Sequence, residues 1–185
     1  MKKRFGIKEV VAMGIGTALF VVLTNVQIPL VIVPNTALQP RMAVLAFFSA
    51  VFGPIVGGVI GFLGHALGDA LFYGSVWWSW VFPEVVVGAA IGFFAKKFAV
   101  AEGKFASTKV ITLFNICQVA ANAVAWIVVA PVLDILVYAE PANKVFTQGA
   151  FAFLGNIIII GILGTLLLSA YSKIVGKSSD LKVED

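Results

Sequence analysis

Long stretches of this sequence contain no charged residue, and that absence limits the kinds of fold open to the chain. Between Val10 and Pro40, and again between Val145 and Ser172, there is no Asp, Glu, Lys or Arg. Over the whole chain 61% of residues are hydrophobic and only 12% are charged, with a mean hydropathy of +1.04. A soluble domain is about half apolar and about a quarter charged. We therefore interpret the chain as an integral membrane protein whose helices are surrounded by lipid.

The apolar residues fall into six segments that predict membrane helices. An α-helix needs about 20 apolar residues to cross the hydrocarbon core. The segments lie at roughly 9–27, 40–52, 54–72, 78–97, 109–131 and 145–172. The second is short, and Gly53-Pro54 predicts a tight turn into the third. The sequence thus predicts an all-α integral membrane protein, with a single domain of six transmembrane helices over residues 1–185.

The distribution of Lys and Arg predicts the orientation of these helices. With six spans, eleven basic residues fall on one side of the membrane: Lys2, Lys3, Arg4, Lys8, Lys96, Lys97, Lys104, Lys109, Lys173, Lys177 and Lys182. Only Arg41 and Lys144 fall on the other side. Because basic loops stay in the cytoplasm, we expect a multi-pass cell-membrane protein with both termini inside. The net charge of +4 then reflects orientation, and no basic soluble face suggests a nucleic-acid partner.

The three outer connections are unusually apolar or aromatic for loops. They are Gln27–Arg41, a segment near Asp69–Trp78, and Pro131–Lys144. The inner connections are short or simply basic. We therefore expect the functional site on the outer side, where Asn35 in the loop VPNTALQPR is one candidate ligand contact.

The stretch GHALGDALFYGSVWWSWVFPE gathers most of the candidate site residues. His65 and Asp69 are four residues apart and share one helix face, so either Asp69 orients the imidazole or both contact a ligand. Tyr73, Trp77 and Trp78 are further candidates. An aromatic belt at the membrane surface is the alternative for the Trp residues. Three Trp within four positions cannot all face lipid, however, so at least one should point inward and stack on a flat ligand.

Polar residues inside the predicted helices are a second source of candidates, because such groups are costly in a membrane and tend to be functional. Glu84 lies inside the fourth helix, and Arg41 is a possible ion-pair partner. Asn122 and Trp126 share a face near the outer end of the fifth helix, where we expect ligand contact. For Asn115 and Gln118, nearer the inner end, interhelical hydrogen bonding and ligand contact remain equally open.

Two features concern partners and cofactors. In the first helix, Ala12 and Gly16 are four residues apart, as are Gly14 and Ala18, and such small residues favour close contact with another helix, in this chain or in another subunit. The stretch VGKSS lacks the preceding Gly of a phosphate-binding loop. No paired-His or Cys motif predicts a metal site. We therefore expect no metal and no cofactor, with any ATP hydrolysis on separate subunits.

Four segments together resemble a known family: KKRFGIKEVVAMGIGTALFVVL, VPNTALQPR, FGPIVGGVIGFLGHALGD and YGSVWWSWV. They are similar to the substrate-binding S components of energy-coupling-factor (ECF) vitamin transporters, over nearly the whole chain. The resemblance is closest to a cobalamin- and riboflavin-type subgroup. It implies six helices, a vitamin pocket on the outer side, and docking through small residues of the first helix onto a membrane coupling subunit (the T component) that sits on two ATPases.

The resemblance further implies that the S component topples in the membrane and carries the vitamin inward. Cobalamin is the expected vitamin, with riboflavin as the alternative, because aromatic surface and amide side chains suit both. An intramembrane enzyme using His65, Asp69 and Glu84 as an acid–base set is the alternative of another class. No paired-His motif and no Ser in a Gly-rich elbow supports that alternative.

Overall fold

The computed structural model describes residues 6–30 and 36–180, with side chains up to residue 177. Apart from two short strands, the regular secondary structure of the described residues is helical. The α-helices are α1 (Ile7–Thr24), α2 (Arg41–Phe52), α3 (Pro54–Phe72), α4 (Trp78–Phe93), α5 (Ala95–Phe98), α6 (Thr108–Ala123), α7 (Ala130–Tyr138), α8 (Ala142–Ile159) and α9 (Thr165–Asp180). The π-helical segments Val124–Val129 and Ile160–Gly164 join α6 to α7 and α8 to α9, and a 3-10 turn covers Val100–Glu102. Strands β1 (Ile28–Pro29) and β2 (Ala37–Leu38) pair antiparallel.

Several helices are long and apolar enough to cross a membrane. Among the described residues they are Ile7–Thr24, Pro54–Phe72, Thr108–Tyr138 and Ala142–Lys177. A fifth span results if α4 is counted together with the bent segment Ala95–Glu102, which departs from it by 49°. Helix α2, with 12 residues, is shorter than a membrane helix needs to be. The all-α membrane architecture is therefore confirmed, with four to five long candidate spans.

One predicted loop is helical instead. We expected an outer connection from Pro131 to Lys144, but the helix that begins at Thr108 continues to Tyr138, leaving only a short link to α8. Pro131 is tolerated because it lies in the first turn of α7, directly after a π-helical segment that already interrupts the regular hydrogen-bond ladder. The extension matters for the site, because it carries Asp134 into the bundle.

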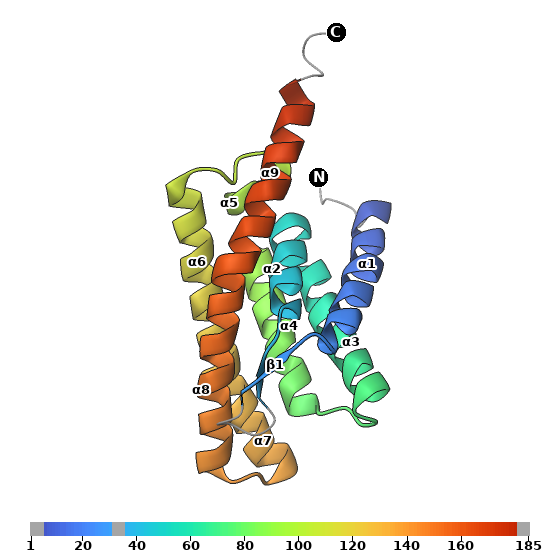
Figure 1. Ribbon diagram of the computed structural model, residues 1–185, viewed down its shortest axis with the longest axis vertical. Coiled ribbons are helices and arrows are strands. Elements are labelled where there is room, and N and C mark those ends of the chain that lie inside the picture. Colours follow the sequence, from blue (N-terminus) through green and yellow to red (C-terminus); the bar gives the residue numbers. More distant parts are fainter. Residues whose placement is uncertain (1–5, 31–35, 181–185) are drawn as a thin grey trace.

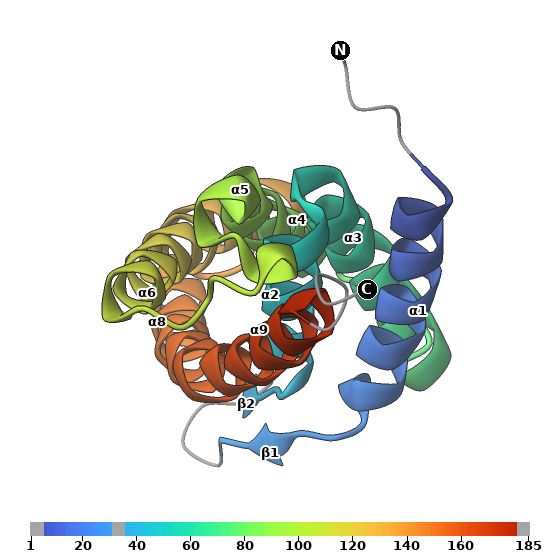
Figure 2. The same cartoon turned by 90° about the horizontal axis from the view of Figure 1, so that it is seen from above.

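Helices α3 and α4 approach each other closely through glycine. A Cβ on Gly57 would collide with the backbone carbonyl of Gly88, and a Cβ on Gly61 would lie 2.6 Å from the carbonyl oxygen of Glu84. Small residues of this kind let helix backbones come together in a membrane. Helix α1 packs against α3 and α2 at the side of the bundle (Figure 2). The close packing of α3 on α4 places His65 beside Glu84.

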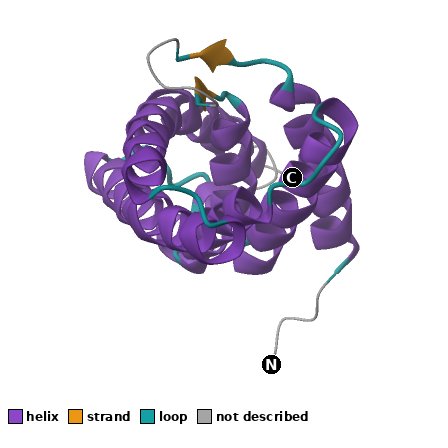
Figure 3. Cartoon of the chain, turned by 90° about the horizontal axis from the view of Figure 1, so that it is seen from below, coloured by secondary structure: helices purple, strands orange, loops and turns teal. Residues whose placement is uncertain are grey.

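The two ends of the bundle differ in character. The start of α1, the end of α9 and the short helix α5 lie at one end (Figure 1). The buried rings of Phe98 at the end of α5, of Phe105 and of Phe114 fill that end with edge-to-face contacts. The β1–β2 ribbon, the α3–α4 loop and the α7–α8 link lie at the opposite end, which faces the viewer in Figure 3.

Candidate functional site

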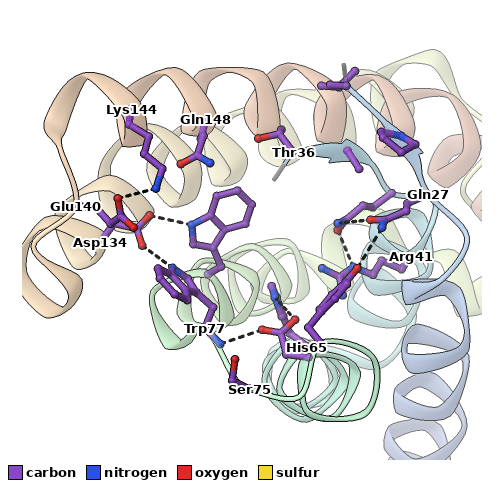
Figure 4. A pocket seen from close by; sticks show the side chains of 17 residues that line it. Gln27, Thr36, Arg41, His65, Ser75, Trp77, Asp134, Glu140, Lys144 and Gln148 are labelled. Carbon is purple, nitrogen blue, oxygen red and sulfur yellow. Dashed lines mark hydrogen bonds and ion pairs between the residues drawn. The ribbon is translucent and has the colours of Figure 1, made fainter. Parts of the chain in front are cut away.

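A cavity of about 730 Å³ opens at the end of the bundle that carries the β-ribbon. Elements from both halves of the chain contribute to its wall, as Figure 4 shows. Its lining is formed by Gln27, Pro29, Leu30, Thr36, Ala37, Gln39, Arg41, His65, Asp69, Tyr73, Ser75, Trp77, Trp80, Asp134, Glu140, Lys144 and Gln148. This volume lies in the range of about 300–1,000 Å³ that is usual for small-molecule sites.

Arg41, at the start of α2, anchors one side of the cavity. Its guanidinium donates three hydrogen bonds: from Nε to Gln39 (2.7 Å), from Nη1 to Thr24 (3.0 Å) and from Nη2 to Glu84 (3.2 Å). The guanidinium carbon also lies 4.7 Å from the centre of the Phe20 ring, where a cation–π contact forms. Arg41 is 3% exposed and Glu84 is fully buried, so their predicted ion pair is confirmed and is shielded from solvent.

The carboxylate of Glu84 continues this network into α3. Its Oε2 lies 3.0 Å from Nδ1 of His65, and Nε2 of His65 lies 3.4 Å from Oδ1 of Asp69. Oδ2 of Asp69 accepts the backbone N–H of Trp77 at 3.0 Å. His65 therefore lies between two carboxylates. Asp69 orients the imidazole and also holds the backbone of Trp77, the residue that directly precedes α4. We call Arg41, Glu84, His65 and Asp69 the buried polar network.

A third carboxylate, that of Asp134 in α7, accepts hydrogen bonds from residues at the start of α4. Its Oδ1 accepts the indole N–H of Trp77 at 2.7 Å and the hydroxyl of Ser79, and its Oδ2 accepts the indole N–H of Trp80 at 2.9 Å. Asp134 is 2% exposed. Trp77 also stacks on Tyr138, with ring centres 4.1 Å apart and planes 17° apart. Both indole rings border the cavity.

Polar side chains also border the mouth of the cavity. Lys144 of α8 pairs with Glu140 at 2.7 Å. On the other side, Gln27 donates to the hydroxyl of Tyr73 at 3.1 Å, close to Arg41 in Figure 4. Both cations of the lining, Arg41 and Lys144, are thus already paired with carboxylates.

The structure brings together about half of the residues that the sequence predicted for a ligand site. Arg41, His65, Asp69, Tyr73 and Trp77 line the cavity. Glu84 does not reach the lining and supports it through Arg41 and His65. The five lining residues come from α2, α3 and the α3–α4 connection, and Glu84 comes from α4. The site therefore depends on the packing of α2 and α4 against α3.

Besides Glu84, three other predicted residues do not line the cavity. Trp78 is 43% exposed and packs on Phe62, as expected of a ring in the aromatic belt. Asn122 is buried and donates its amide to the Gln118 carbonyl of its own helix. Trp126 is buried edge-on against Trp80, one layer behind the wall. Asn35 lies outside the described residues.

The two amides whose role was open take part in helix packing. Asn115 donates to the hydroxyl of Thr165 in α9 at 3.2 Å, and Gln118 donates to the carbonyl of Ile157 in α8 at 3.2 Å. Both bonds join α6 to the last helices of the chain, as interhelical hydrogen bonds do in membrane bundles. The packing alternative is confirmed for both residues.

Sequence reasoning missed most of the cavity wall that α7 and α8 provide. Asp134 of α7, Glu140 of the α7–α8 link, and Lys144 and Gln148 of α8 line it. Trp80 of α4 was missed as well. A signal was present, since these charges interrupt an otherwise apolar region and charged groups in such a region tend to be functional. Treating residues 131–144 as a loop hid that signal, because a loop position makes a charge unremarkable.

The small residues of α1 divide between two faces. Ala12 and Gly16 are buried, and a Cβ on Gly16 would collide with Ile60 of α3. Gly14 and Ala18 are exposed, and the position of a Cβ on Gly14 is open space. They lie in one row with Val10 and Val22, which are 55% and 65% exposed. Of the two rows of small residues, the second is the one on the exposed surface of α1, next to Val11, Ile15 and Leu19.

No cluster of three or more His, Cys, Asp or Glu side chains that could hold a metal ion occurs among the described residues. The nearest approach to one is His65 between Glu84 and Asp69. Those carboxylates are already bonded to Arg41 and to the Trp77 backbone.

Comparison with known proteins identifies a family. The family model described as "ECF-type riboflavin transporter, S component" matches residues 4–173. A UPF0397 protein of Exiguobacterium is 50% identical over 180 residues, covering 97% of this chain and 98% of its own. A UPF0397 protein of Streptococcus gordonii is 51% identical over 178 residues, covering 96% and 95%. One of Enterococcus faecalis is 45% identical over 181 residues, covering 98% of each. No solved structure matches the chain.

Proposed function

The chain belongs to the family of ECF-type riboflavin transporter S components, and on that premise we propose that it captures a vitamin in the cavity between the β-ribbon and α8. Members of this family are transporter subunits, so the intramembrane enzyme considered above is rejected. The observation that carries the proposal is the cavity of about 730 Å³ at the end opposite the α5 lysines.

We place the cavity on the outer side of the membrane, with both chain termini in the cytoplasm and six spans in total. Lys8 of α1 and Lys96 and Lys97 of α5 lie at the end opposite the cavity, as do α9 residues such as Lys177. Basic residues mark the cytoplasmic face. Helix α2 is the sixth span in this proposal, and its 12 residues cross only part of the bilayer, with the β-ribbon and outer loops completing the path.

Riboflavin is the vitamin that we propose, in place of the cobalamin expected above. The family description names riboflavin and does not name cobalamin. The cavity volume suits a vitamin of drug-like size, whereas a corrinoid is far larger. A flat tricyclic ring can stack on Trp77, Trp80 or Tyr73. Riboflavin is also uncharged, which fits a cavity whose two cations are paired with carboxylates.

Transport requires partners in this proposal, namely a membrane coupling subunit and two ATPases. We propose that α1 docks on the coupling subunit through the row Val10, Gly14, Ala18 and Val22. This row is exposed, and its two central residues, Gly14 and Ala18, are small enough to let another helix approach closely. Ala12 and Gly16 are left out of this proposal, because they are packed inside the chain. Movement of the S component in the membrane then delivers the vitamin inward.

An uptake assay tests the proposed function. Cells that need riboflavin and lack their own carrier would receive this chain alone, the coupling subunit and ATPases alone, or all of them. We expect riboflavin accumulation only with the full set, and its loss when the catalytic site of the ATPases is inactivated. Equal accumulation without this chain, or uptake of cobalamin and not riboflavin by the full set, would reject the proposal in its present form.

A further inference from the structure

Asp134 accepts three side-chain hydrogen bonds beside the cavity, and none of them comes from a residue of the buried polar network. Three donors converge on its carboxylate: the indole N–H groups of Trp77 and Trp80 and the hydroxyl of Ser79. All three belong to four consecutive residues at the start of α4, whereas Asp134 belongs to α7. We call this set the Asp134 clamp.

The geometry of the clamp fixes two aromatic rings at once. An indole has a single N–H, so a bond from that group to a buried acceptor determines the direction in which the ring edge points. Oδ1 takes Trp77 and Oδ2 takes Trp80, so one rigid carboxylate sets both rings. Tyr138 supports Trp77 by stacking, and Trp126 supports Trp80 edge-on at 5.3 Å.

The clamp also determines which part of each indole is available to a ligand. With both N–H groups directed at Asp134, neither is free to donate to a molecule in the cavity, although both side chains line it. The rings therefore offer carbon surface to the cavity. Asp134 is only 2% exposed, and three donors already stabilise its carboxylate. A ligand therefore does not need a positively charged group to balance this carboxylate.

We propose that Asp134 is a positioning residue that holds Trp77 and Trp80 as one aromatic wall for the planar, uncharged part of the ligand. This inference rests on the proposed function, since it assumes that the cavity takes a flat vitamin. It adds a role for α7, whose helical extension past Pro131 is what brings the carboxylate to the start of α4.

The test combines Asp134→Asn with a spectrum of the ligand-free protein and a riboflavin titration. Asparagine keeps the size of the side chain but offers one oxygen and an NH₂ group, which cannot accept from an indole N–H. We expect the near-ultraviolet circular dichroism of the Trp residues to change without ligand. We also expect riboflavin affinity to fall about tenfold or more, given the usual strength of stacking on aromatic side chains. Asp134→Glu should recover part of both signals.

Trp78→Phe is the matched control, because Trp78 belongs to the same segment but packs on Phe62 away from the cavity. It should leave riboflavin affinity unchanged. If Asp134→Asn fails to fold, Trp80→Phe replaces it, since Phe keeps an aromatic ring and removes the N–H. Affinity should then fall in Trp80→Phe and not in Trp78→Phe.

The outcomes separate this inference from the proposed function. A wild-type spectrum and wild-type affinity in Asp134→Asn, or equal affinities in the two Phe variants, would overturn the clamp while leaving riboflavin binding intact. If the unaltered chain bound no riboflavin, the proposed function would fail, and the planar-ligand part of this inference with it. The ligand-free spectrum would still show whether Asp134 orders the two rings.

Discussion

Arg41 and Glu84 form an ion pair in the interior of the bundle, and its surroundings explain how two charges remain there. Arg41 donates to Thr24 and Gln39 as well as to Glu84, and Glu84 also faces His65. A buried charge is tolerated when further hydrogen bonds satisfy it, as the bonds to Thr24 and Gln39 do for the Arg41 guanidinium. The pair joins α2 to α4 at the edge of the cavity, so it serves both the fold and the site.

A double-mutant cycle tests this pair. Arg41→Met and Glu84→Leu should each destabilise the protein by about 3–5 kcal/mol, because each leaves an unpaired buried charge, whereas the double variant should be more stable than either single one. Thermal unfolding in detergent micelles measures the differences. Additive losses in the double variant would mean that the two charges do not depend on each other.

Residue patterns in the sequence were sufficient to identify this pair but not the cavity wall opposite. Arg41, His65, Asp69 and Glu84 stood out because each is a polar group in an apolar stretch. Asn122 and Trp126 stood out for the same reason, yet face packing contacts. A helical spacing shows which residues share a face but not which neighbour that face meets, and that is decided by packing between helices.

Among the elements, α3 and α4 form the closest pair, and glycine is the reason. Gly57 meets the backbone of Gly88, whereas Gly58, its neighbour in sequence, has only the side chains of Val85 and Ala89 nearby, at 3.7 and 4.0 Å. The two glycines thus occupy different environments on one helix. Their comparison separates the effect of close packing from that of helix propensity.

Gly57→Ala should destabilise the protein by about 1–3 kcal/mol or more, because the added Cβ has no room against backbone that cannot move aside. Gly58→Ala should be neutral or stabilising by up to about 1 kcal/mol, because Ala favours helix more than Gly does. Unfolding of the two variants in micelles gives the comparison. Equal stability would contradict the proposed role of Gly57 in the helix contact.

Helix α1 permits a similar comparison for docking. Gly14→Trp and Ala18→Trp enlarge the exposed row and should abolish uptake with the coupling subunits while leaving riboflavin binding by the isolated chain intact. Gly16→Trp is the contrast, since its side chain would enter the core beside Ile60 and should impair folding and binding together. Normal uptake in both exposed variants would show that the coupling subunit contacts another surface.

At the level of elements, the predicted helix 54–72 agrees with α3, and the other long helices were located to within a few residues except at two ends. The fifth predicted helix continues past Pro131 to Tyr138, and the sixth continues past Ser172 to Asp180. Hydrophobic runs identify membrane helices well because lipid requires the backbone to bond within its own segment. The continuation of α6 through a π turn into α7 was not predictable in the same way. Proline is a strong sign of a helix end, and only the complete structure shows that the helix resumes.

The two ends of the molecule differ. Helix α5, with Lys96 and Lys97, and the buried rings of Phe98, Phe105 and Phe114 lie at one end. The cavity and its paired charges (Figure 4) lie at the opposite end, where Figure 1 shows the β-ribbon. Two cations and three carboxylates line the cavity, and Arg41 and Lys144 each lie within 3.2 Å of a carboxylate oxygen. This arrangement suits an uncharged ligand taken up on the outer side. Such a subunit would select the vitamin and leave the use of ATP to its partners.

Equilibrium binding of riboflavin to the purified chain, with cobalamin as a parallel ligand, tests the central claim most directly. Quenching of flavin fluorescence would follow binding to the unaltered protein and to Trp77→Ala, with Trp78→Ala as the control outside the cavity. We predict saturable one-to-one binding of riboflavin that is weakened by Trp77→Ala alone. Binding of cobalamin without riboflavin, or riboflavin binding that Trp77→Ala leaves unchanged, would contradict the account.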